Sequence, residues 1–220
     1  AALLEIGQKI CLMKKQRSLW AAVSILTAAS AWALTASEAF TSAPRSVFPL
    51  LDNNTRLDMV DYFNAGVQRP SEKATDGTSV ITSMTPEVVT VKLSDASQVE
   101  ICVLPASPQP IIMLITTVRT PADDSSVAFY TSDWKPLASK GILNAPTLDD
   151  WLTDKSKRID VEMTVPFMLA SAKYNGTTGE LVFTNNLATF LTNDVYKDIA
   201  PVMRPSITYK WNNKSFSKVR

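Results

Sequence analysis

The stretch that decides the fold is EVVTVKLSDASQVEICVLPASPQPIIMLITTVRTPADDSSVAFYTSDW, residues 87–134. Apolar and polar residues alternate at 87–94, 98–105 and 126–134, as in β-strands that turn one face toward a core. The segment at 110–118 is apolar at nearly every position, which is typical of a central strand covered on both faces. The separators are short and rich in Ser, Asp and Pro, a composition typical of turns. Short strands joined by short turns predict an antiparallel meander.

An amphipathic helix is predicted before the meander, at residues 55–65. Asn54 or Thr55 is expected to cap its start, and Gly66 to end it. The apolar residues that recur at helical spacing, and so define the expected core face, are Leu57, Val60, Phe63 and Val67. The polar residues assigned to the opposite face are Arg56, Asp58 and Asp61.

Residues 135–157 interrupt the alternation and predict a long connection with a short helical turn at 147–153. Alternation at 158–165 predicts another strand, and two more strands are expected around a loop at 175–179. The chain is then expected to form a short helix, capped by Asn193 and ended by Pro201, and a final hairpin within residues 206–219 that turns at Asn212 and Asn213.

These elements predict an α+β fold, an antiparallel β meander with an N-terminal amphipathic helix and a short late helix. An all-β sandwich is the alternative. We expect one mature domain, residues 40–220, in which the connection at about 136–157 is the candidate joint between two halves. The sequence leaves open whether these halves share one core.

The N-terminal residues resemble an export signal. Lys14, Lys15 and Arg17 precede an apolar run of about fifteen residues, shorter than the roughly twenty needed to span a bilayer as a helix. The run ends in Ala-Trp-Ala at residues 31–33, which fits a signal peptidase site, and a second candidate site lies at 37–39. We therefore expect residues 1–39 to be a signal peptide with an upstream extension and the mature protein to be periplasmic or on the cell surface. No membrane span is expected after cleavage.

Charge and composition exclude several classes of function. Residues 1–39 hold four basic and two acidic residues, and removing them from the totals of 22 and 21 leaves 18 and 19, a net charge of about −1. No basic cluster remains, so nucleic acid is not an expected partner. Histidine is absent from the chain, which removes the commonest general base and metal ligand. We expect no cofactor.

The candidates for catalysis are weak. Ser132 and Lys135 have the spacing of an S-x-x-K motif, but its companion motifs are missing. Cys102 alternates with apolar residues and has no histidine to activate it. Two aspartate pairs could supply the carboxylates of a glycosidase, although adjacent side chains tend to diverge: Asp123 with Asp124, and Asp149 with Asp150. We assign no catalytic or metal-binding residue.

Three aromatic side chains are the candidate ligand contacts: Trp134, Tyr209 and Trp211. Exposed aromatic rings on a sheet can stack on sugars or anchor a protein partner. The alternative is that they pack inside and hold the meander together.

Four stretches of the mature chain resemble a known family: FPLLDNNTRLDMVDYFNAG, VEICVLP, VAFYTSDWKPL and ITYKWNNKSF. They are similar to exported proteins of unknown function from gut Bacteroidetes-type bacteria. The likeness runs from about residue 44 to the end of the chain, with Thr55 as a departure at the start of the helix. It implies a periplasmic or surface location, and it brings no established activity or catalytic residue that could be carried over to this chain.

The sequence therefore favours a non-enzymatic exported protein that binds a protein or carbohydrate ligand. The alternative is a hydrolase or inhibitor-like module that uses carboxylates on an exported substrate. A subunit of an envelope assembly is a third hypothesis.

Overall fold

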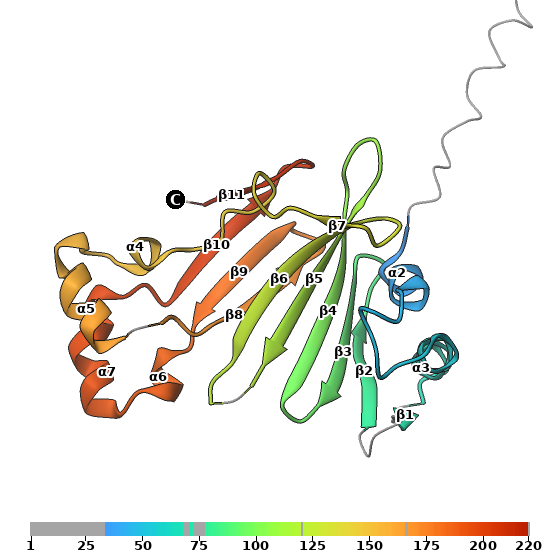
Figure 1. Ribbon diagram of the computed structural model, residues 1–220, viewed down its shortest axis with the longest axis horizontal. Coiled ribbons are helices and arrows are strands. Elements are labelled where there is room, and N and C mark those ends of the chain that lie inside the picture. Colours follow the sequence, from blue (N-terminus) through green and yellow to red (C-terminus); the bar gives the residue numbers. More distant parts are fainter. Residues whose placement is uncertain (1–33, 68–70, 73–77, 120, 166, 220) are drawn as a thin grey trace, which may run out of the picture. The chain divides into compact units, whose positions relative to one another are not determined.

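The stretch at 87–134 forms the predicted antiparallel strands, and three further strands that the sequence did not predict extend the meander at its ends. In the computed structural model, which describes residues 34–67, 71–72, 78–119, 121–165 and 167–219, seven strands pair in their sequence order (Figure 1). Their bounds are β1 Ser71–Glu72, β2 Thr78–Met84, β3 Val88–Ser94, β4 Ser97–Leu104, β5 Ile111–Val118, β6 Asp124–Thr131 and β7 Pro136–Leu137. All neighbouring pairs are antiparallel, because their connections are too short for the crossover of a parallel pair.

The centre of the meander is buried on both faces. On β4 and β5, Ile101 and Ile112 belong to one hydrophobic cluster, whereas Cys102 and Met113 belong to another. All four side chains are fully buried. Because neighbouring residues of a strand point to opposite faces, each strand contributes to both clusters. The expectation that the apolar segment at 110–118 is covered on both faces is confirmed.

Two N-terminal helices, α2 (Ala36–Ser42) and α3 (Asn53–Asn64), cover one face of the meander (Figure 1). The predicted helix is present as α3 but begins earlier, because Asp52 caps it by accepting a hydrogen bond from the Thr55 N–H at 2.8 Å. The predicted core face was right only at Val60 and Phe63, which pack against the core. Leu57 is 44% exposed, whereas Arg56 is 2% exposed.

Helix α2 lies partly before residue 40, where we expected the mature domain to begin. Ala36, Ala39 and Phe40 are fully buried, so these residues belong to the fold. A cut at the second candidate site, 37–39, would remove Thr35, which caps the helix together with Glu38. The first candidate site and the rest of the predicted signal peptide lie outside the described residues.

A second, four-stranded antiparallel sheet has the order β11-β10-β9-β8. Its strands are β8 Ala170–Asn175, β9 Glu180–Asn185, β10 Ser206–Trp211 and β11 Phe216–Lys218. The helices α6 (Leu187–Phe190) and α7 (Asn193–Ile199) and the 3-10 turn η2 (Ala200–Val202) connect β9 to β10. Both predicted hairpins and the short late helix are therefore present, with mixed α+β architecture, although the N-cap of α7 is Thr192 and not Asn193.

The strand predicted at 158–165 is wrong. These residues form helix α5 (Arg158–Thr164), which follows the 3-10 turn η1 (Lys155–Lys157). Val161 and Val165 are buried, while Ile159 and Met163 are 69% and 83% exposed. The two residues of each pair are four positions apart and therefore lie on the same face of a helix. Together the two pairs place an apolar residue at every second position, which imitates the alternation of a strand.

The connection between the sheets contributes to the core. It holds helix α4 (Leu148–Trp151), and Trp151 is 1% exposed. Trp151 packs in the same hydrophobic cluster as Phe129 of the meander and Leu181 of the second sheet. Residues on both sides of the connection therefore share this cluster, and the chain from Leu34 onward forms one compact unit.

Side chains of the meander bind the edge of the second sheet. Alternate N–H groups of β8 point away from its neighbouring strand β9, because β8 is at the edge of its sheet. These N–H groups donate to side chains of the meander and not to the backbone of another strand. Ala170 N–H donates to Asp124 Oδ1 at 3.1 Å, and Ala172 N–H donates to Ser125 Oγ at 2.9 Å. Tyr174 N–H donates to Glu100 Oε2 at 3.4 Å. Because these acceptors lie on β6 and β4, β8 runs across the face of the meander.

A buried arginine joins the two N-terminal helices. The Arg56 guanidinium on α3 donates to the carbonyl oxygens of Thr41 (3.3 Å) and Ala43 at the end of α2, and to that of Leu51 (2.6 Å). Carbonyl groups at a helix C-terminus have no partner within their own helix, so the arginine supplies the missing donors. Its Nε has no hydrogen-bond partner among the described residues.

Replacing Arg56 with methionine will lower the free energy of unfolding by about 2–4 kcal/mol, because carbonyl oxygens lose their donors inside the protein. Urea denaturation followed by circular dichroism measures this loss. Exposed Arg45 is the matched control, and Arg45→Met will change the same quantity by less than about 0.5 kcal/mol. Equal losses in both variants would contradict the joining role of Arg56.

Candidate functional site

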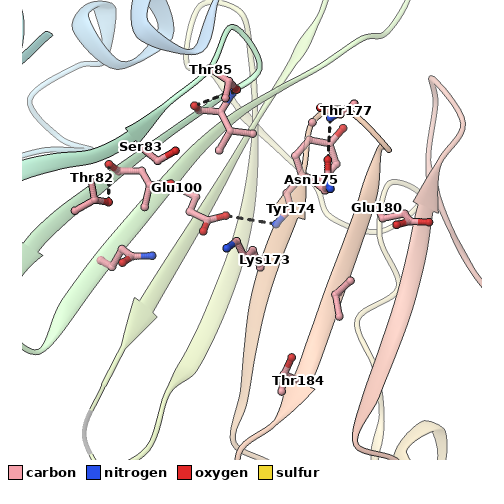
Figure 2. A pocket seen from close by; sticks show the side chains of 15 residues that line it. Thr82, Ser83, Thr85, Glu100, Lys173, Tyr174, Asn175, Thr177, Glu180 and Thr184 are labelled. Carbon is pink, nitrogen blue, oxygen red and sulfur yellow. Dashed lines mark hydrogen bonds between the residues drawn. The ribbon is translucent and has the colours of Figure 1, made fainter. Parts of the chain in front are cut away.

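A polar groove of about 640 Å³ lies between the meander and the β8–β9 hairpin (Figure 2). Its lining is dominated by hydroxyl and amide side chains, with Val88 and Val182 as aliphatic members. Polar side chains among the lining residues include Thr82, Ser83, Thr90, Gln98, Asn175 and Thr184. Such a surface offers many hydrogen-bond donors and acceptors to a ligand.

The alternation of the strands produces this polar surface. On β3 and β4, Thr90 and Gln98 face the groove, while their neighbours Val91 and Val99 pack under the N-terminal helices. The second sheet is divided in the same way on β8 and β9, where Lys173 and Thr184 line the groove and Ala172 and Phe183 belong to the core. Apolar residues on the groove face of β4, such as Cys102, lie in the core shared by the two sheets. The crossing strand β8 thus separates that core from the groove.

Glu100 places a buried carboxylate in the groove. Glu100 is 5% exposed. Its carboxylate accepts a long hydrogen bond, of 3.4 Å, from the Tyr174 N–H. Burial raises the pKa of Glu100, while the Tyr174 N–H and the nearby ammonium of Lys173 partly offset this rise. Glu100 forms no ion pair with any residue that the structure describes. The ionised form of Glu100 is therefore incompletely compensated and costs stability.

The turn between β8 and β9 forms part of the groove wall in a fixed conformation. Asn175 Oδ1 accepts hydrogen bonds from the N–H groups of Thr177 (3.0 Å) and Thr178 (3.1 Å). The next residue, Gly176, touches the turn between β2 and β3: a Cβ atom at Gly176 would lie 2.6 Å from the Cβ of Glu87. Glycine is required here by this close contact between the two hairpins.

The aromatic residues predicted to contact a ligand are buried instead. Trp134, Tyr209 and Trp211 are 6%, 4% and 7% exposed, so none presents an open ring face. Trp134 Nε1 donates to Ala39 O at 3.1 Å, and Trp211 Nε1 donates to Pro105 O at 2.8 Å. These three rings stabilise the core, which was the alternative interpretation of the sequence.

The aspartate pairs do not line the groove, and three of their four carboxylates have structural partners. Asp124 binds the edge of β8, and Asp149 pairs with Arg158. Asp150 accepts hydrogen bonds from Thr147 and pairs with Lys218 at 2.7 Å. Its partial burial raises the pKa, but these donors outweigh burial and hold the pKa of Asp150 at about 2.

The remaining candidates are also accounted for by the fold. Cys102 is fully buried, and burial together with the charge of Glu100 raises the pKa of its thiol. Ser132 Oγ donates to Gln109 Oε1 at 3.1 Å. Among the described residues, no group of His, Cys, Asp and Glu side chains could hold a metal ion. Within the same residues, no helix is both long and apolar enough to cross a membrane.

Sequence reasoning missed Glu100, although a signal was present. It is the single polar residue in the part of β4 that runs from Val99 to Leu104. A charged residue in such a strand has to meet a compensating group or a solvent-filled space.

Glu100→Gln will raise the free energy of unfolding at pH 7, because glutamine keeps an acceptor for Tyr174 N–H without a buried charge. The raised pKa means that folding disfavours the ionised form, so the cost of Glu100 is present above its unfolded pKa of about 4.3 and disappears below it. The gain of the variant will therefore shrink as the pH falls toward about 4. Urea denaturation at several pH values measures this gain in the free energy of unfolding. Glu180→Gln, which replaces another carboxylate of the same groove, is the control. A gain that does not depend on pH would contradict this account.

Comparison with known proteins agrees with the fold and assigns no activity. No curated protein matches the chain. A solved structure, a domain of an uncharacterized protein from Porphyromonas gingivalis W83, has a similar fold with a TM-score of 0.71 at 21% sequence identity, covering 83% of this chain and 96% of that one. Residues 28–216 match the model of a family described as "Protein of unknown function (DUF3256)". The chain belongs to the DUF3256 family.

Proposed function

We propose that this protein is a non-enzymatic binding protein of the periplasm or cell surface, and that it holds a polar protein or carbohydrate ligand in the groove between its two sheets. The observation that carries the proposal is the buried, incompletely compensated carboxylate of Glu100 in a groove of about 640 Å³. A volume of this size is typical of ligand sites. Groups that lower the stability of their own fold are characteristic of functional sites.

The carboxylates of the groove favour binding over hydrolysis. Glu100 and Glu180 both line it, but Glu100 points from the meander toward β8, while Glu180 lies beyond β8 on β9 (Figure 2). A glycosidase needs two carboxyl groups that flank one bond from opposite sides. The Glu180 carboxylate instead accepts a hydrogen bond from Thr178 Oγ1 at 3.1 Å within its own hairpin.

The proposed location rests on the export-like signal at residues 13–33. Fractionation of the native host, with antibody detection of the protein, tests it. Recovery in the periplasmic or outer-membrane fraction supports the proposal, and recovery in the cytosol contradicts it.

Filling the groove will abolish ligand binding. Thr184 is exposed and lines the groove, so Thr184→Trp adds a large side chain there with little expected change in stability. Binding to a glycan array and to a peptide display library measures the effect. Ser126→Trp, at an exposed position of β6 outside the groove, is the matched control and will bind as the wild type does.

Two results would overturn the proposal. One is a wild-type protein that binds nothing on the array or in the library. The other is ligand that mass spectrometry finds cleaved after incubation, which would establish the hydrolase alternative.

A further inference from the structure

We infer that Glu100 binds a positively charged side chain of an extended peptide, so that the ligand is a lysine- or arginine-containing segment of another protein. This inference rests on the proposed function and names the ligand class of the same groove.

The excess of carboxylate groups in the groove favours a positively charged ligand. Its lining holds two carboxylates, Glu100 and Glu180, and one ammonium group, Lys173. A third carboxylate side chain, Glu87, touches the turn at Gly176. A ligand ammonium or guanidinium would pair directly with the buried carboxylate of Glu100, which forms no ion pair with a described residue and is only partly compensated by the nearby Lys173 ammonium.

The rest of the lining favours a peptide over a sugar. Tyr174 is the aromatic residue of the groove, but it is 4% exposed and its ring packs edge-on against Phe216 in the core, with centroids 6.1 Å apart. Among the described residues that line the groove, none therefore offers a ring face on which a sugar could stack. The hydroxyl groups of Thr90 and Thr184 and the amide of Gln98 can hydrogen-bond a peptide backbone.

Lys173 provides a test of charge. It lies beside Glu100 in Figure 2, and its ammonium acts electrostatically on the Glu100 carboxylate. A cationic ligand side chain at Glu100 would be repelled by this ammonium. Removing Lys173 will therefore strengthen the binding of a cation, whereas an uncharged ligand would gain nothing from it.

Isothermal titration calorimetry of the full chain in 0.15 M salt, where attraction between exposed charges is largely screened, tests the inference. The probes are hexalysine, hexalysine acetylated on every side chain, and the neutral sugar cellohexaose. Hexalysine will bind, and acetylation will weaken its binding by about tenfold or more. Glu100→Gln will weaken hexalysine binding by a similar factor, and Lys173→Met will strengthen it.

Matched variants separate binding at Glu100 from a general attraction between hexalysine and the charge of the protein. Asp198→Asn removes an exposed carboxylate on α7, and Lys140→Met removes an exposed ammonium in the connection between the sheets. Both lie outside the groove, and both will leave hexalysine binding unchanged. Circular dichroism of each variant confirms that it is folded.

The inference is overturned if acetylated hexalysine binds as tightly as hexalysine, or if Asp198→Asn weakens binding as much as Glu100→Gln. It is also overturned if hexalysine fails to bind. Cellohexaose binding that Thr184→Trp abolishes would then leave the proposed function standing with a sugar as ligand. A wild-type protein that binds none of the three probes, the glycan array or the peptide library would remove both proposals.

Discussion

The fold depends on the hydrogen bonds that the N–H groups at the edge of β8 donate to the meander. Three of its N–H groups, those of Ala170, Ala172 and Tyr174, donate to side chains of the meander. An edge strand normally leaves such donors open to another strand. Here the acceptors come from the face of a sheet, so the second sheet crosses the first instead of extending it. This crossing creates the shared core on one side of β8 and the polar groove on the other.

Two buried charges of this protein have different surroundings. Arg56 donates to three carbonyl oxygens and thereby joins the ends of two helices. Glu100 accepts one long hydrogen bond from a backbone amide and forms no ion pair with a described residue. Because the carboxylate of Glu100 retains capacity for further partners, it is suited to bind something from outside the chain.

The errors of sequence reasoning have identifiable causes. At 158–165 two apolar pairs with a spacing of four imitated the alternation of a strand, although one pair faces the core and the other faces solvent. On α3 one of the two buried positions belongs to Arg56, because the α2 carbonyl groups offer it partners that hydropathy cannot indicate. Trp134, Tyr209 and Trp211 are buried by segments distant in sequence, such as Ala39, whose carbonyl group accepts the Trp134 N–H.

The sequence by itself determined the four central strands of the meander, β3 to β6, both later hairpins and the two-sided burial of β5, because alternation and turn composition are local properties. It also indicated the mixed α+β class. It did not indicate β1, β2 or β7. Only the tertiary structure decided what covers each face, and therefore where the groove lies and why Glu100 is buried. Alternation assigns a residue to one face of a strand, but long-range packing decides whether that face meets a helix, another sheet or solvent.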